Sequence, residues 1–325
     1  MSMKSFIIRV VIFLVLFLSI IALFLLPITV VFEQAACRSK DLDPYSRINF
    51  VTECKDFNAD LIIIGNSRAK DGYNDALLSK ETGLKCLNLG MAGYPFNFQY
   101  HIMYKTYIKQ NVKPKYIIAE IGPFSFLDYT TPRYTIEMLP YIDREEFKFY
   151  YDICPELSFM DQYRIVRYAG KYEEIFSEIW KLRGSEQIQS IAVDNLEDVP
   201  VNVAYEKNYL KKKKFAVERD PAIIKVFNSF LDECNAQGIQ VVLVCSPIHT
   251  TDGLSHFDME GFWSLIAEIQ KGHHVKVLNY QNLYGNDLRY FANSMHLSPY
   301  GKYSFTRRIA HDLDSLNIIR STKKN

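Results

Sequence analysis

Short, nearly continuous apolar runs recur along the chain, most of them closed by a glycine, a proline or a polar residue. The first run is LIIIG, and later runs such as IQVVLVCSP have the same character. Continuous apolar runs rich in β-branched residues are typical of strands in a parallel sheet that is covered on both faces. We therefore predict strands at 61–65, 85–90, 115–122, 239–247 and 274–280.

Between these runs, apolar residues recur at helical spacing. PAIIKVFNSFLDECNAQG is the clearest case, because a proline stands at its start and a glycine at its end. Similar patterns predict helices at 75–83, 96–110, 261–271 and 299–316. Strands that alternate with helices predict an α/β fold, whose functional sites lie beyond the carboxyl ends of the strands.

The segment 124–220 interrupts this alternation. It is rich in tyrosine, phenylalanine and charged residues, its pattern is mostly helical, and it contains the run LKKKKF. We interpret it as a helical insertion over the site edge of the sheet. The four lysines are expected to be a solvated surface, with contact to an anionic glycan or lipid head groups as the alternative.

The N-terminus has a different pattern, because no charged residue occurs from Val10 to Phe32. A bilayer span takes about 20 such residues, whereas a cleaved signal peptide has an apolar region of about 7–15. We therefore predict an uncleaved signal-anchor transmembrane helix. Lys4, Arg9 and the amino terminus precede this run, and they favour a cytoplasmic N-terminus.

This orientation predicts a single-pass membrane protein whose main domain lies outside the cytoplasm. We expect three parts. Residues 1–32 hold the cytoplasmic N-terminus and the anchor, 33–59 form a juxtamembrane segment, and 60–325 form the main domain with its insertion.

Charge and cysteine content narrow the function classes. The chain has 38 basic and 37 acidic residues, which excludes an overall nucleic-acid-binding signature. Six cysteines in 325 residues are too few for a disulfide scaffold. Cys86 and Cys245 lie in strand-like runs and are expected to be buried thiols, whereas a disulfide between Cys37 and Cys54 stays open.

Small and polar residues follow two predicted strands, and a histidine precedes the last predicted helix. Ser67 follows the first strand, Gly93 follows the second, and His296 lies in NSMHL. Because the carboxyl ends of parallel strands meet at one edge, we expect these residues to lie close together. Ser67 considered alone would more simply be a turn residue or a helix cap, with Arg68 solvated.

In order and spacing, these motifs resemble those of the SGNH (GDSL-like) hydrolase superfamily. That family has a Gly-Asp-Ser block, an Asn followed five residues later by a Gly, and an Asp-x-x-His block before a helix. The chain is most similar to the membrane-anchored, envelope-facing branch that includes the D-alanyl transfer protein of teichoic acids and the alginate O-acetylation proteins. The resemblance covers about 60–316 outside the insertion. The matching residues are Gly65-Asn66-Ser67, Asn88 with Gly93, and Asn293-Ser294-Met295-His296.

The resemblance implies the SGNH hydrolase fold, a flavodoxin-like, three-layer, doubly wound parallel sheet. It also implies a catalytic set of Ser67, His296 and Asn293, with the backbone N–H groups of Ser67 and Gly93 as oxyanion donors. The chemistry is consistent, because a serine is a poor nucleophile until a base takes its proton. Each fixed oxyanion donor is worth about 2.7–4 kcal/mol. No metal ion or organic cofactor is required.

The chain departs from the family pattern at two places. The loop IGPFSF after the third strand lacks the family's Asn, so a third oxyanion donor stays open among Asn66, Asn97 and Ser125. Asn293 stands where the family has Asp, and Asp287 is a less favourable substitute six residues upstream. An Asn orients a His without supplying charge, and the same exchange in serine proteases costs about 10⁴ in rate.

The sequence thus predicts a serine acyl-ester enzyme, an esterase or O-acyltransferase of the bacterial envelope. It would move an acyl (acetyl) group to or from a cell-surface polysaccharide, beside a membrane-bound O-acyltransferase as partner. A plain esterase is the first alternative. The second is a catalytically inactive SGNH-like module that binds glycan or scaffolds a membrane acyltransferase complex, which Asn293 favours.

Overall fold

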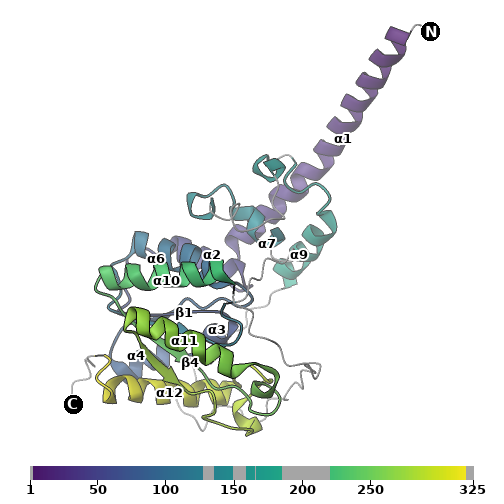
Figure 1. Ribbon diagram of the computed structural model, residues 1–325. Helices are drawn as coiled ribbons and strands as arrows, with labels where there is room; N and C mark the ends of the chain where they lie inside the picture. Colours follow the sequence, from purple (N-terminus) through teal and green to yellow (C-terminus); the bar gives the residue numbers. More distant parts are fainter. Residues whose placement is uncertain (1–2, 127–134, 149–158, 165, 185–219, 320–325) are drawn as a thin grey trace. The chain divides into compact units, whose positions relative to one another are not determined.

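The computed structural model describes residues 3–126, 135–148, 159–164, 166–184 and 220–319 (Figure 1). These residues form two compact units. One consists of the described residues within Met1–Phe50 and Thr130–Gln189, and the other of those within Val51–Tyr129 and Ser190–Asn325. The predicted insertion is therefore divided between the units, and the lysine run LKKKKF lies outside the described residues.

The second unit is built on a parallel sheet of five strands in the order β2-β1-β3-β4-β5. This is the strand order of the flavodoxin-like doubly wound sheet, so the predicted parallel α/β sheet is confirmed. In the register, Ile63 lies opposite Asn88 on one side and Ile118 on the other. All five predicted strands are present: β1 (Leu61–Ile64), β2 (Cys86–Asn88), β3 (Tyr116–Glu120), β4 (Gln240–Cys245) and β5 (Lys276–Asn279).

Helices cover both faces of this sheet (Figure 1). Because crossovers between parallel strands are right-handed, the direction of each connection determines the face on which its helix lies. One face carries α3 (Ser67–Gly72), α4 (Asp75–Thr82) and α12 (Pro299–Ser315), of which α4 and α12 are in contact. The other carries α5 (Phe96–Phe98), the π-helix η1 (Gln99–Tyr104), α6 (Lys105–Gln110), α10 (Pro221–Ala236) and α11 (Met259–His273).

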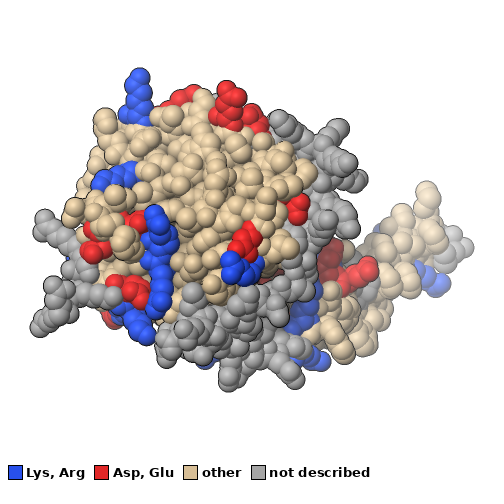
Figure 2. Space-filling model, turned by 90° about the horizontal axis from the view of Figure 1, so that it is seen from below, with Lys and Arg blue, Asp and Glu red and all other residues tan. Residues whose placement is uncertain are grey.

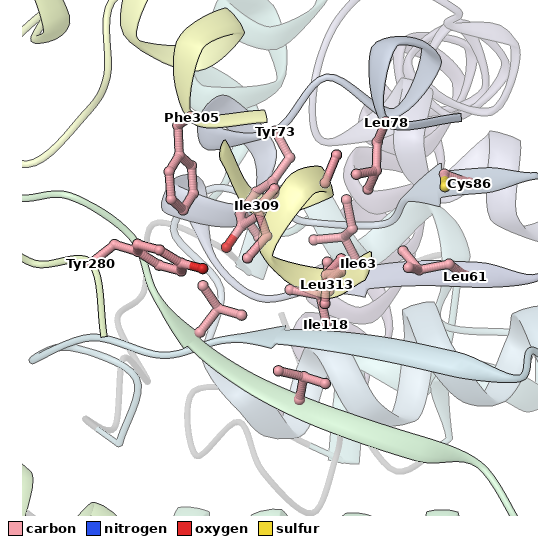
Figure 3. Packing of buried hydrophobic residues seen from close by; sticks show 14 of the residues in the cluster. Leu61, Ile63, Tyr73, Leu78, Cys86, Ile118, Tyr280, Phe305, Ile309 and Leu313 are labelled. Atoms are coloured by element: carbon pink, nitrogen blue, oxygen red, sulfur yellow. The ribbon is translucent and has the colours of Figure 1, made fainter. Parts of the chain in front are cut away.

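Alternate strand residues build a separate core on each face. Leu61, Ile63 and Ile118 point toward α12, where they pack with Phe305 and Ile309 (Figure 3). On the other face the packing is largely aromatic. The ring of Phe96 lies 4.6 Å from that of Phe227 and 5.3 Å from that of Phe230.

The first unit joins the N-terminal helix to the described part of the insertion. Glu33 of α1 (Met3–Arg38) accepts a hydrogen bond from the Tyr168 hydroxyl at 2.9 Å and pairs with Arg164. The Tyr45 hydroxyl of α2 (Tyr45–Glu53) donates to Glu178 of α9 (Tyr172–Gly184) at 2.9 Å. The other helical segments are α7 (Thr135–Met138), η3 (Leu139–Tyr141), η4 (Glu145–Phe147) and η5 (Phe159–Gln162).

Two whole-chain expectations can be compared with the described residues. Within the described residues, no helix is long and apolar enough to cross a membrane. On the face seen in Figure 2, basic and acidic side chains lie close to one another. That mixture is consistent with the near balance of charges in the sequence.

In the part of the chain that the structure describes, Cys37 and Cys54 are not joined to each other by a disulfide. Cys86 and Cys245 are buried, as predicted. Burial raises the pKa of the Cys86 thiol to about 11 and that of the Cys245 thiol to about 12. These two cysteines are therefore protonated core residues at neutral pH.

Candidate active site

The turn after β1 presents Ser67 at the carboxyl edge of the sheet. Gly65 has a φ of +143°, and a Cβ there would lie 2.9 Å from the Cβ of Glu120, so only glycine fits. Asn66 caps the following helix, because its Oδ1 accepts a hydrogen bond from the backbone N–H of Arg68 at 3.0 Å. Ser67 is therefore the first residue of α3 and not its cap. The sequence pattern did not predict this short helix.

His296 is held in a tight loop before α12. Phe291 and Leu297 form an antiparallel bridge across the base of the loop, and the Ala292 N–H donates to the His296 carbonyl at 2.9 Å. Ser298 then caps α12 by accepting from the Gly301 N–H at 3.1 Å. The backbone of this loop is thus fixed on both sides of the histidine.

The structure brings Ser67, His296 and Asn293 into one hydrogen-bonded chain. The Ser67 Oγ lies 2.7 Å from His296 Nε2, and His296 Nδ1 lies 2.9 Å from Asn293 Oδ1. The same Oδ1 accepts from the backbone N–H groups of Met295 and His296, each at 3.0 Å. Because an amide nitrogen cannot accept these bonds, the Asn293 oxygen must face His296.

This orientation determines the tautomer of His296. Nδ1 must carry the proton that it donates to Asn293 Oδ1, which leaves the Nε2 lone pair to accept from the Ser67 hydroxyl. A neutral imidazole with Nε2 on a serine Oγ is the arrangement of a general base beside a nucleophile.

The surroundings of His296 keep its imidazole neutral. Burial lowers its pKa below the ordinary value of 6.5, and the nearby positive charges of Arg68 and Lys70 lower it further, while Asp71 acts in the opposite direction. At neutral pH the imidazole is therefore free to accept a proton. Asp287, the alternative partner, instead accepts hydrogen bonds from the Arg289 Nε and backbone N–H, at 3.0 and 3.1 Å.

Gly93 lies in the loop after β2, at the same edge of the sheet. Its φ of +79° is in the left-handed region, where glycine is favoured. Asn88, at the end of β2, donates to the Ala69 carbonyl at 2.8 Å and accepts from the Gly90 N–H at 2.9 Å. Asn88 thus ties the loop after β2 to α3, while the oxyanion roles of the Ser67 and Gly93 N–H groups stay predictions.

The three candidates for a third oxyanion donor differ in position. Asn66 and Ser125 both line a pocket at the carboxyl edge of the sheet, whereas Asn97 is buried and accepts from the Phe98 N–H at 2.8 Å. The Ser125 Oγ accepts from the Gly122 N–H at 2.9 Å. Asn66 and Ser125 therefore remain the two candidates at the site.

A buried polar network that the sequence pattern did not indicate lies behind the nucleophile. Arg68 is 4% exposed, so the solvated arginine that belonged to the alternative interpretation of Ser67 is wrong. Its Nε lies 3.1 Å from Glu120 Oε1, and its Nη2 donates to the Ser246 Oγ at 2.8 Å. Glu120 also accepts from the Tyr73 hydroxyl at 2.5 Å. The network joins the carboxyl ends of β1, β3 and β4.

One sequence signal could have revealed this network. Glu120 ends the run YIIAE, in which every other position is apolar or aromatic. A carboxylate at a buried strand position needs a partner, and the arginine beside the candidate nucleophile supplies it. Within the described ranges, no group of three or more His, Cys, Asp or Glu side chains is placed to hold a metal ion.

The solved structures described here are distant likenesses of this chain. No family model matches the sequence, and no curated protein matches it significantly. Among solved structures, a protein of the G-D-S-L lipolytic family from Desulfitobacterium hafniense is 10% identical with a TM-score of 0.39, over 77% of this chain and 97% of that one.

Two carbohydrate esterases are similarly distant. A mutant of the acetyl-xylooligosaccharide esterase Axe2 from Geobacillus is 10% identical with a TM-score of 0.39, over 84% of this chain and 100% of that one. A family two carbohydrate esterase from Clostridium thermocellum is 10% identical with a TM-score of 0.34, over 82% and 67%. Likenesses at these TM-scores are too weak to assign a fold or an activity to this chain.

Proposed function

We propose that this chain is a serine acyl-ester enzyme of the SGNH type. The observation that carries the proposal is the chain of hydrogen bonds from the Ser67 Oγ through His296 to Asn293 at the carboxyl edge of the sheet. The motif resemblance of the sequence and the strand order of the sheet support the same assignment.

In the first half-reaction, the Ser67 Oγ attacks the carbonyl carbon of an acyl ester while His296 Nε2 takes the hydroxyl proton. The carbonyl oxygen becomes an oxyanion, which the backbone N–H groups of Ser67 and Gly93 stabilise. The C–O bond to the leaving alcohol then breaks as His296 returns the proton to the departing oxygen. The products are an acyl-Ser67 ester and a free alcohol.

In the second half-reaction, an acceptor hydroxyl gives its proton to His296 Nε2 and attacks the acyl-Ser67 carbonyl. Collapse of this second oxyanion re-forms the Ser67 hydroxyl, which receives the proton from His296. Water as acceptor gives hydrolysis, and a sugar hydroxyl gives O-acyl transfer. We favour transfer of an acetyl or similar acyl group to or from a cell-surface polysaccharide.

The location in the bacterial envelope is part of the same proposal. It rests on the charge-free run from Val10 to Phe32 in the sequence. An anchor of this kind would hold the enzyme beside a membrane-bound O-acyltransferase that supplies acyl groups. The cytoplasmic N-terminus rests on the charges that flank the run.

Asn293 favours a second candidate function. An amide oxygen orients His296 but places no negative charge beside the imidazolium that forms during the reaction. A catalytically inactive module that binds glycan or scaffolds a membrane acyltransferase complex would tolerate this residue. The two candidate functions differ in whether the Ser67 Oγ becomes acylated.

Hydrolysis of phenyl acetate by the full-length protein in detergent tests the enzymatic proposal. We expect phenol release that falls by at least about a thousandfold in Ser67→Ala and in His296→Ala, since each removes a member of the nucleophile–base pair. Release of phenol at equal rates by the wild type and Ser67→Ala would count against the proposal. Adding a polysaccharide acceptor and measuring acylated glycan separates transfer from hydrolysis.

A further inference from the structure

A small pocket lies beside the Ser67 turn, at the carboxyl edge of the sheet. Its walls include Asn66 from the turn after β1, Tyr94 and Phe96 from the segment after β2, and Phe124 after β3, with Gln99 at the start of η1. These loops surround β1, where the order of the strands reverses and doubly wound folds bind their ligands. Its empty space, including the part open to solvent, is about 230 Å³, so only a small group can enter it.

Gln99 places one unsatisfied acceptor in this mainly apolar wall. Its side chain is 1% exposed, and its Nε2 donates to the Met91 carbonyl at 3.1 Å. Its Oε1 is buried and has no hydrogen-bond partner among the described residues. Exchanging the two amide atoms would set an oxygen against the Met91 carbonyl, so the orientation is determined and Oε1 is the free acceptor.

The backbone keeps Gln99 in place. It is the first residue of a π-helix, Gln99–Tyr104, a form that is rare and often found at functional sites. The next residue, Tyr100, donates a hydrogen bond from its hydroxyl to Glu233 of α10 at 2.5 Å. A buried acceptor held this way cannot turn to find water outside, and it gains when a ligand supplies a donor.

The position of the pocket indicates which half of an ester would enter it. The leaving alcohol must lie within reach of His296 Nε2, which protonates it. The loop from Asn293 to His296 contributes nothing to the pocket, whose lining residues come from the segments after β1, β2 and β3. A pocket lined by these segments and not by the histidine loop suits the acyl half of the ester better than the leaving alcohol.

We infer that Gln99 determines acyl specificity, by accepting a hydrogen bond from a hydroxyl group on a short acyl chain, close to the ester carbonyl. This inference rests on the proposed function, since it requires that Ser67 is acylated. An acyl group with such a donor satisfies the Gln99 Oε1, whereas an apolar acyl group of the same size leaves it buried and unpaired. Sites of this kind discriminate strongly against the ligand that lacks the polar group.

Phenyl glycolate and phenyl propionate test the inference, because their acyl groups have the same number of heavy atoms and differ by a hydroxyl in place of a methyl. The ratio of kcat/KM for phenyl glycolate to kcat/KM for phenyl propionate is divided by the ratio of their hydroxide-catalysed rates, which removes the difference in intrinsic reactivity. We expect this corrected ratio to be about tenfold or more for the full-length wild type. Gln99→Met, which keeps the length of the side chain, should bring this ratio to one or below.

Gln237→Met is the matched control. Gln237 also has a buried Oε1 without a partner among the described residues, but it lies at the end of α10 and not in the pocket. Its variant should keep the wild-type ratio. If the wild type hydrolyses both esters with no preference for glycolate, as when water fills the site, the inference about Gln99 is wrong and the proposed function stands. The same holds if the ratio in Gln99→Met equals that of the wild type. Failure of the wild type to hydrolyse either ester overturns the proposed function as well.

Discussion

Asn293 is the residue on which the chemistry of the candidate site depends most. Its one amide oxygen receives three hydrogen bonds, from His296 Nδ1 and from the backbone N–H groups of Met295 and His296. An aspartate could accept the same three bonds in the same place. The exchange therefore removes charge from the site without removing the orientation of His296.

Asn293→Asp should accelerate the enzyme. A carboxylate at this position would stabilise the imidazolium of His296, and the reverse exchange costs about 10⁴ in the serine proteases. We expect kcat for phenyl acetate to rise by at least about tenfold. Asn286→Asp is the control, since the Asn286 Oδ1 accepts from the Thr251 N–H in an exposed loop, whereas the bond to His296 Nδ1 is made by Asn293. A kcat that stays level in Asn293→Asp would show that charge at this position does not limit the reaction.

The protonation of His296 predicts the pH profile. Burial is the main reason that its pKa lies below 6.5, so the neutral, reactive form persists into mildly acidic solution. The expected kcat/KM is level near neutral pH and declines only as the pH falls through this lowered pKa. The same shift makes the contribution of His296 to stability decrease below pH 6.5, because the unfolded chain binds the proton more readily.

Measuring kcat/KM for phenyl acetate between pH 4.5 and 8.5 checks the position of the acidic limb. In Asn293→Asp the limb should move to higher pH, because a nearby carboxylate favours the protonated imidazole. An acidic limb of the wild type that lies above pH 6.5 would contradict the assignment of a buried, neutral His296 as the base.

At the scale of elements, the ends of β1, β3 and β4 are joined by the network around Glu120. Its Oε1 lies 3.1 Å from the Arg68 Nε and accepts from the Ser246 Oγ at 2.6 Å. The Arg68 and Glu120 side chains are 3% and 1% exposed. Neither charge can recover hydration if the other is removed, so the pair is expected to hold the nucleophile turn in place.

Glu120→Gln should destabilise the fold by about 3–5 kcal/mol, since it leaves the Arg68 charge buried without its counterion. Urea unfolding of the full-length protein measures the loss. Asp60→Asn removes the carboxylate partner of Lys115, whose side chain is 70% exposed, and should cost no more than about 1 kcal/mol. Equal destabilisation by the two substitutions would contradict the structural role given to the network.

The elements differ in how far the sequence predicts them. Runs such as LIIIG have one dominant period and clear ends, and the predicted strands and helices of the sheet unit are present. The helix α3 is missed because Gly65, Asn66 and Ser67 have turn propensities. The hydrogen bond from the Arg68 N–H to Asn66, which caps this helix, becomes apparent only in the structure. The burial of Arg68 is missed because its partners Glu120 and Ser246 lie far along the chain.

The candidate site is likewise only partly predictable. Ser67 and Gly93 follow the first two predicted strands and His296 follows the last one, so topology predicts that all three lie at the carboxyl edge of the sheet. The role of Gln99 cannot be inferred in this way. Its significance depends on which of its two amide atoms finds a partner, and that is determined by the Met91 carbonyl and the π-helical backbone.

At the scale of the whole molecule, the proposed anchor is the feature most open to experiment. Phe13→Glu combined with Leu16→Glu should release the full-length protein from membranes during carbonate extraction. Charged residues at the centre of a span cost about 2.5–3.5 kcal/mol each on translocon-insertion scales. Val112→Glu is the control, because Val112 is 68% exposed but lies outside α1. Extraction of the wild type itself would contradict anchoring.

The central claim is that Ser67 is a nucleophile, and covalent labelling with a fluorophosphonate tests it most directly. Such a probe reacts with a serine Oγ that a neighbouring base has activated, whatever the natural substrate is. We predict that peptide mass spectrometry of the labelled full-length protein will place the adduct on Ser67. Labelling should be strongly slowed in His296→Ala and lost in Ser67→Ala. A folded wild-type protein that takes up no probe at Ser67 between pH 7 and 8.5 would contradict the account.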